Sequence, residues 1–229
     1  SGMTEGGIFP AILGSFYLMV LTFLVSVPLG VFTGVFLSEY GNNPVARWID
    51  LSLTALSGIP SVVYGLFGLA FFCVALQFGT SMLAAALTLS LMTLPVISSS
   101  TREALKAIPI ELRESALALG ATKEETIFKV LLPAAKKSII TAVLVGGGRA
   151  LGETAPVLLT GAVFYSTHLP KNLFSPVMTL PTHLYYIVAA YGESAQWMAK
   201  GTAAFLMIIV AAIYGIAFFL RRRDDGTSH

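Results

Sequence analysis

Arg149 and Glu153 are a cation and an anion four residues apart inside an apolar run over 138–165. In an α-helix this spacing places both side chains on one face. Charges inside an apolar segment are costly and usually face a protein interior or an aqueous path. A guanidinium donates two hydrogen bonds in a planar fork, so it suits the oxygens of phosphate. Two interpretations stay open: a self-neutralising structural ion pair, or a cation that helps an anion through.

Three hydroxyl residues are further candidates for lining such a path: Thr154, Ser61 and Tyr64. Hydroxyl groups in apolar helices also bond to helix backbone or to neighbouring helices, and this second interpretation stays open. The sequence has no His, Cys and carboxylate cluster with the spacing of a metal site, so no metal is expected.

The amino-acid composition indicates the class of protein in which these residues are placed. Hydrophobic types make up 55% of the 229 residues and charged types 11%, whereas a soluble domain carries about a quarter charged residues. This balance excludes a disordered chain, a coiled coil and a nucleic-acid-binding domain. We therefore expect an all-α, polytopic helical membrane protein that contacts membrane lipid, in a single transmembrane domain over 1–229.

Apolar runs of about 20 residues predict membrane-spanning helices. Five runs qualify, over 8–37, 59–78, 82–99, 138–165 and 201–220. The segment 44–56 contains charges and predicts a helix along the membrane interface. The residues at 57–60 then predict a break and a new helix start, since Pro60 suits a first helical turn.

The basic residues predict the orientation. Eleven of the 14 Lys and Arg residues fall on one side of the five spans, seven of them between 101 and 137. Because Lys and Arg concentrate on the cytoplasmic side, the 101–137 loop and the C-terminus are predicted there, in a multi-pass protein of the cell membrane. On the outer side, 177–191 predicts a short interfacial helix. A sixth span there is less favoured because it would put the basic tail outside.

The 101–137 loop has strong signals for two short helices. Pro109 can open a helix that ends near Leu119, and Gly120 can close it in the left-handed conformation. Thr122 and Glu125 have the spacing of a capping box that starts a second helix. We expect Pro133 to stop this helix. Exposed leucines beside these charges favour a docking element for a cytoplasmic partner over an ordinary solvated loop.

The loop resembles the EAA loop of ABC importer permeases, with a small-for-small change at its second position. The matching residues are Glu114, Ser115, Ala116, Gly120, Leu132 and Pro133. Two further segments resemble the PstA-type permeases of phosphate importers. They are Gly58-Ile59-Pro60-Ser61-Val62-Val63-Tyr64-Gly65 and Arg149-Ala150-Leu151-Gly152-Glu153-Thr154-Ala155-Pro156.

This resemblance implies a type I ABC importer permease core with about five transmembrane helices. It also implies a phosphate importer in which a PstC-like second permease forms the other half of the pathway. PstB-like ATPase subunits would bind ATP and Mg and receive the 101–137 loop, and a PstS-like protein outside would deliver inorganic phosphate. An importer permease for another oxyanion, such as molybdate or sulfate, is the alternative.

The sequence itself supports this division of labour. None of its seven Lys residues follows a Gly, so it lacks the Gly-Lys-Ser/Thr phosphate loop. We therefore expect no ATPase activity and no cofactor in this chain. Two other classes of membrane protein fit less well. An aspartyl intramembrane protease needs Asp residues within its spans, but the three Asp residues of this sequence lie outside the predicted spans. A channel would need no docking loop.

Overall fold

The computed structural model describes residues 7–166 and 168–225, so residues 1–6, 167 and 226–229 of the predicted single domain lie outside it. Apart from one isolated bridge between Ala162 and Val177, the regular structure of the described residues is helical. The predicted all-α class is therefore confirmed.

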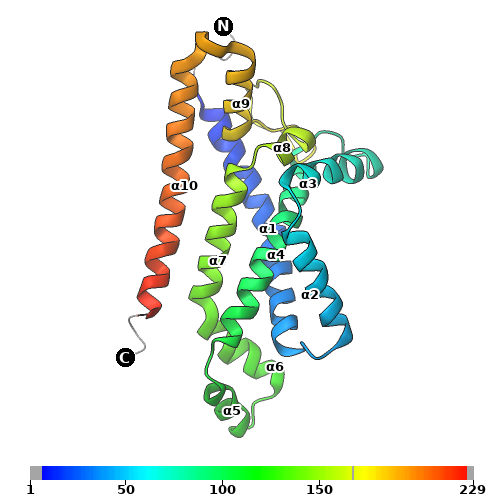
Figure 1. Cartoon of the computed structure of the whole chain (residues 1–229), viewed down its shortest axis with the longest axis vertical. Coiled ribbons are helices and arrows are strands. Elements are labelled where there is room, and N and C mark those ends of the chain that lie inside the picture. Colours follow the sequence, from blue (N-terminus) through cyan, green and yellow to red (C-terminus); the bar gives the residue numbers. More distant parts are fainter. Residues whose placement is uncertain (1–6, 167, 226–229) are drawn as a thin grey trace.

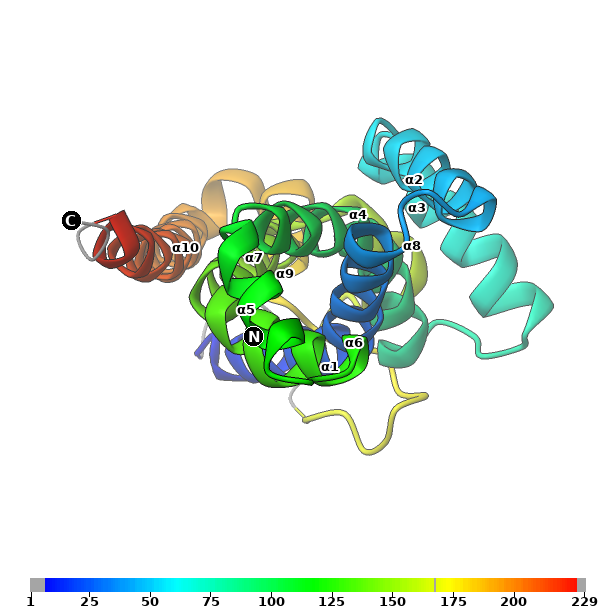
Figure 2. The same ribbon diagram turned by 90° about the horizontal axis from the view of Figure 1, so that it is seen from below.

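Four long helices run along the longest axis of the molecule (Figure 1). They are α1 (Phe9–Glu39), α4 (Met82–Lys106), α7 (Leu132–Gly152) and α10 (Gln196–Asp225). Helix α4 packs against both α1 and α7, and α10 packs against α7 at the edge of the bundle (Figure 2). In its most apolar 18-residue window α4 is 67% buried, compared with 6% for the stretch Leu180–Arg222 that contains α10. The core therefore lies around α4.

Two glycines allow α1 to approach α4 closely. A Cβ atom on Gly30 would lie 2.6 Å from Cγ2 of Ile97, and one on Gly34 would lie 2.5 Å from Cβ of Thr101. These separations are shorter than van der Waals contact, so only glycine fits at both positions. Small residues at such spacing are typical of helix contacts in membranes.

The described helices only partly match the five predicted spans. Three stretches are long and apolar enough to cross a membrane, Phe9–Glu39, Met82–Lys106 and Leu180–Arg222, and a bent helix pair would be a fourth. Helix α7 is less apolar than these stretches because it contains Lys136, Lys137, Arg149 and four glycines. It nevertheless lies within the bundle, against α4 and α10.

The predicted interfacial helix and second span form that bent pair. Helix α2 (Pro44–Ser57) meets α3 (Ser61–Gly68) and the π-helical η1 (Leu69–Ala75) at 108°. The predicted break is confirmed, although Pro60 lies at the N-cap directly before α3 and not in the first helical turn for which it was predicted. The predicted independent span over 59–78 is wrong in length, since the helical part ends at Ala75 after 15 residues. Hydropathy alone did not reveal the π-helical turns or this end.

The predicted single span over 138–165 is also wrong. Helix α7 ends at Gly152, Glu153 is extended, and a separate six-residue helix, α8 (Ala155–Thr160), follows. Pro156 explains the interruption: its nitrogen carries no proton for the carbonyl of Gly152, and its ring would clash with that carbonyl. On the predicted outer side, α9 (Leu180–Tyr191) matches the short helix predicted over 177–191, and the 3₁₀ turn η3 (Gly192–Ala195) leads into α10.

The loop between α4 and α7 contains α5 (Ile110–Ala118), α6 (Lys123–Thr126) and the π-helical η2 (Ile127–Leu131). Pro109 precedes α5 and Gly120 has a φ of +89°, as predicted. The predicted stop at Pro133 is wrong, because the backbone stays helical from α6 through η2 into α7. Proline is tolerated in the first turn of α7, directly after the π-helical turns. This loop lies at the same end of the bundle as the C-terminal end of α10 (Figure 1).

Candidate functional site: an ion pair at a helix break and a coupling loop

Arg149 and Glu153 meet where α7 ends. The Nε atom of Arg149 lies 3.7 Å from Oε1 of Glu153, which is beyond hydrogen-bond distance. The Arg149 side chain is 48% exposed in this chain and that of Glu153 is 16% exposed. Glu153 is the residue after the helix, not a member of it as predicted. The pairing is loose, so the guanidinium keeps donors for another oxygen ligand.

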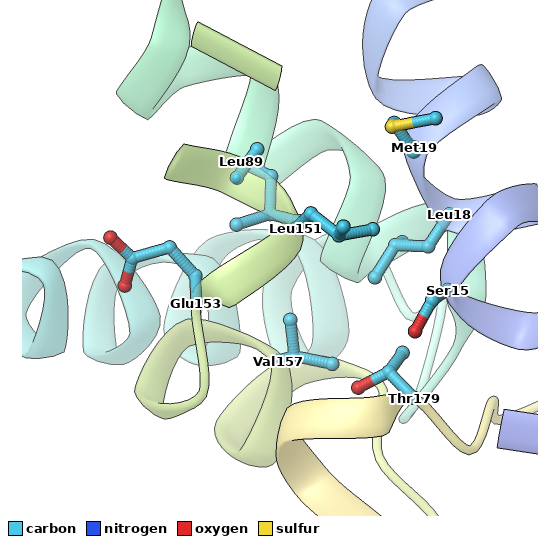
Figure 3. A pocket seen from close by; sticks show the side chains of 9 residues that line it. Ser15, Leu18, Met19, Leu89, Leu151, Glu153, Val157 and Thr179 are labelled. Carbon is cyan, nitrogen blue, oxygen red and sulfur yellow. The ribbon is translucent and has the colours of Figure 1, made fainter. Parts of the chain in front are cut away.

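A small cavity lies next to this pair, enclosed by α1, α4, α7 and α8. Its volume is about 10 Å³, roughly the space that one water needs. The carboxylate of Glu153 points away from the hydroxyls of Ser15 and Thr179 on the other side of the cavity (Figure 3). A phosphate ion is larger than one water, so this cavity is not itself a phosphate site.

The three hydroxyl candidates differ in accessibility. Tyr64 is 5% exposed and its hydroxyl donates a 2.7 Å hydrogen bond to the carbonyl of Leu56. This bond joins α3 to the end of α2 and agrees with the backbone interpretation of that hydroxyl. Ser61 opens α3 and Thr154 precedes α8, and both are half-buried.

The packing of α3 against α8 brings the two motifs of the sequence together. A Cβ atom on Gly65 would lie 3.0 Å from Cα of Pro156 and 2.8 Å from Cδ1 of Leu159. The segments 58–65 and 149–156 therefore form one structural unit at the break between α7 and α8.

Contacts that were not predicted from the sequence join the loop to α1. Arg113 of α5 forms an ion pair with Glu39, whose side chain is 2% exposed. Lys123 donates a 2.9 Å hydrogen bond to the carbonyl of Glu39 and lies 3.8 Å from the ring centroid of Tyr40. We call these four residues the α1–loop joint. The only signal in the sequence was the opposite charge of Glu39, just past the predicted span over 8–37, and Arg113, within the predicted first loop helix.

The predicted capping box holds the second loop helix. Glu125 N–H donates to Oγ1 of Thr122, and Thr122 N–H donates to Oε2 of Glu125, both at 3.1 Å. Lys129 donates to Oε1 of Glu125 at 2.7 Å. The Lys129 hydrogen bond, and next the backbone of Thr122, hold the pKa of Glu125 below its ordinary value. The turn after Gly120 is therefore fixed locally.

Helix α5 presents most of its surface to solvent, and none of its nine residues is buried. Glu114 and Ser115 are exposed and Ala116 is half-buried. The apolar side chains of Leu112, Leu117 and Leu119 are 42%, 47% and 90% exposed. Such a patch is typical of a protein-binding surface.

The last two residues of the EAA-like motif lie farther along the chain. Leu132 is half-buried against a core cluster that includes Leu105, Leu131 and Ala135, and Pro133 is exposed at the start of α7. They connect the loop to the bundle through the continuous helix from α6 to α7.

His183 lies on the buried side of α9. The residue is 3% exposed, and neither ring nitrogen has a partner among the described residues.

Known proteins are similar to this chain along most of its length. The chain is 36% identical over 235 residues to the probable ABC transporter permease protein YqgI of Bacillus subtilis, covering 97% of this chain and 78% of that one. It is 38% identical to the phosphate transport system permease protein PstA of Mycobacterium leprae, covering 95% and 72%. These relatives align with nearly the whole chain.

Solved structures support the fold. An inward-facing conformation of the MetNI methionine ABC transporter matches with a TM-score of 0.71 and 21% identity, covering 94% of both chains. At that identity the likeness establishes the fold of an ABC importer permease and not its substrate. The model of one family, described as binding-protein-dependent transport system inner membrane component, matches residues 26–223. The chain therefore belongs to the family of inner-membrane permease components of binding-protein-dependent transport systems.

Proposed function

We propose that this chain is the PstA-like permease of an ATP-driven phosphate importer and forms half of the translocation pathway with a PstC-like second permease. The observation that carries the proposal is the similarity to named phosphate permeases along nearly the whole chain. Besides the Mycobacterium leprae protein, a probable PstA of Methanocaldococcus jannaschii is 35% identical, covering 93% of this chain. Molybdate and sulfate are less well supported as substrates, because neither the relatives' names nor the two motifs point to them.

Arg149 is the proposed contact for the anion on the pathway. Its guanidinium is half-exposed and only loosely paired with Glu153, so it can donate to phosphate oxygens without first breaking a tight ion pair. Glu153 would limit the attraction so that the anion is released. Because the adjacent cavity holds about one water, the second permease would supply the other wall of the phosphate path. Thr154 directly follows Glu153, Ser61 opens α3, and Tyr64 supports the α2–α3 bend.

The loop between α4 and α7 is the proposed coupling element. The exposed leucines of α5 would dock on a PstB-like ATPase subunit, which would bind ATP and Mg and hydrolyse the nucleotide. Closure of the ATPases would move α5, and the α1–loop joint would carry that motion to the end of α1. A PstS-like binding protein would deliver phosphate at the opposite end, and the loop and the C-terminus would face the cytoplasm.

Uptake of labelled phosphate tests the proposal. Cells that depend on this chain for permease function should accumulate labelled phosphate, and excess sulfate or molybdate should not reduce this uptake. If the same cells accumulate labelled sulfate or molybdate but no phosphate, the substrate assignment is overturned and the family assignment stays intact.

A further inference from the structure

The break between α2 and α3 lies at membrane depth. Leu56 and Ile59, which flank the break, both pack against one core cluster. That cluster includes Leu18 of α1 and Leu89 of α4. Each of these two leucines lies well inside an apolar helix that is long enough to cross a membrane. The break is therefore level with the interior of these two spans and not with their ends.

This chain leaves the backbone of the break uncovered. Ser57, Gly58 and Pro60 are exposed. The carbonyls of Gly58 and Ile59 accept no hydrogen bond from the described residues. Lipid tails cannot donate hydrogen bonds, so irregular backbone at membrane depth occurs only where protein or water covers it. The neighbour of this break is therefore not lipid.

The second helix break adjoins the first. Gly65, in the second turn of α3, packs directly against Pro156 of α8. Arg149, near the end of α7 before this break, has a side chain that is 48% exposed. A charge at membrane depth also avoids lipid and faces protein or water. Exposed backbone and an exposed charge in one region thus both require a neighbour other than lipid.

The surface that continues from the break along α3 is apolar. Val62 and Leu66 lie one turn apart and are 49% and 53% exposed. Val63 and Phe67 beside them are 46% and 47% exposed. We call residues 57–60 together with these four side chains the α3 face. Contact with water is unfavourable for such side chains, so a neighbouring protein suits the α3 face better than an aqueous space.

We propose that the α3 face packs against a membrane helix of the second permease. This helix places hydroxyl or amide donors opposite the carbonyls of Gly58 and Ile59, and apolar side chains against Val62 and Leu66. Polar side chains of this kind form hydrogen bonds between helices in membranes. The inference rests on the proposed function for the existence of a second permease, but not for its substrate. Helices α2 and α3 lie at the edge of the bundle opposite α10 (Figure 2), so α10 provides a control surface.

Spin labels in the assembled transporter, reconstituted in a lipid bilayer, test which neighbour covers the α3 face. A nitroxide is attached at Val62→Cys or Leu66→Cys in a Cys73→Ala background. Electron paramagnetic resonance then measures its accessibility to oxygen, which concentrates in lipid, and to a nickel chelate, which stays in water. We expect both labels to be shielded from both reagents. The matched control is Met207→Cys on α10, where the native side chain is 72% exposed, and its label should remain accessible to oxygen.

A photocrosslink identifies the covering protein. A benzophenone attached at Val62→Cys should form an adduct with the second permease on illumination. An adduct with another copy of this chain in its place would overturn the proposal. If either probe is too bulky for the contact, less of the second permease should co-purify with the labelled chain. That loss supports the contact when the same label at Met207→Cys does not cause it.

Two accessibility results would overturn the proposal. Access of oxygen to both α3 labels as high as at Met207→Cys would show that lipid covers the α3 face. Access of the nickel chelate to both would show a water-filled space. These results are distinguishable from a failure of the proposed function: shielded labels in a transporter that takes up no phosphate would reject only the substrate. Accessible labels in a transporter that does take up phosphate would reject only this contact.

Discussion

Gly65 of α3 and Pro156 of α8 pack so closely that a Cβ atom on Gly65 would lie 3.0 Å from the Cα of Pro156. Gly65, which follows Tyr64 in α3, therefore packs directly against Pro156, the proline that interrupts the helix after α7. This contact fixes where α8 begins and therefore where Glu153 lies relative to Arg149.

We predict that Gly65→Ala destabilises the chain, because the added methyl group meets backbone that cannot rotate away. Overpacking of this kind costs about 1–3 kcal/mol, measured as a lower melting temperature of the purified protein. Gly58→Ala is the matched control, since its nearest contact would be 3.7 Å away, at the carbonyl of Ala55. Equal melting temperatures for both variants would contradict the tight contact.

The orientation is tested by labelling. Single cysteines at Leu119 and Ser194, in a Cys73→Ala background, should react with a membrane-impermeant maleimide from opposite sides. Leu119 is 90% exposed, and Ser194 is exposed in η3. This turn leads into the start of α10, which lies at the opposite end of the bundle from the loop (Figure 1). Reaction of both cysteines from outside intact cells would reject the predicted topology.

We predict that a glycine is required at position 120 because of its positive φ and not because a side chain would clash there. Nothing lies within 4 Å of a Cβ atom built there, but its φ is +89°. A β-branched residue at positive φ costs roughly 1–3 kcal/mol, so Gly120→Val should distort the turn before the capping box and abolish phosphate-stimulated ATPase activity while leaving membrane insertion intact.

Two controls separate backbone strain from bulk at Gly120. Gly120→Asn should be milder, since Asn tolerates the left-handed region. Gly215→Val adds the same side chain at an open α10 position without a positive φ, and it should leave ATPase stimulation near normal. Full stimulation in Gly120→Val would mean that this turn does not couple the subunits.

The α1–loop joint predicts a charge-specific effect. Arg113→Gln leaves the carboxylate of Glu39 buried without its partner, and breaking such a pair costs about 3 kcal/mol or more. Both melting temperature and coupled ATPase activity should fall. The double variant Arg113→Gln with Glu39→Gln should regain stability but not coupling if the ion pair carries motion to α1. Recovery of both would assign it a structural role only. Arg47→Ala, at an exposed α2 residue, is the control.

A double variant distinguishes the two interpretations of the Arg149–Glu153 pair, a structural ion pair and an anion contact. Arg149→Ala should slow phosphate uptake about tenfold or more, as expected for loss of a hydrogen bond to a charged group, while assembly stays intact. If the pair is only structural, Glu153→Ala should destabilise the complex and the double Ala variant should recover transport. If Arg149 serves the anion, the double variant should fold and stay inactive. Near-normal uptake by the double variant would exclude the anion-path role.

Local sequence signals predicted the loop well. Pro109, Gly120 and the Thr122–Glu125 capping box act over four or fewer residues of backbone, so their geometry follows from the residue types alone. The all-α class also follows from composition, because so few charges cannot cover an aqueous surface. The same local signals wrongly predicted that the helix stops at Pro133, because they do not reveal the π-helical turns that precede it.

Only the tertiary structure decided how distant segments meet. The contact of Gly65 with Pro156 and the pairing of Arg113 with Glu39 each join helices far apart in the sequence. Pro60 signalled the break after α2 and Pro156 accounts for the break after α7. Hydropathy records how apolar a segment is but not which neighbour buries it, so it could not give the 108° angle between α2 and α3. These features depend on packing between side chains of different helices, which residue spacing within one segment does not specify.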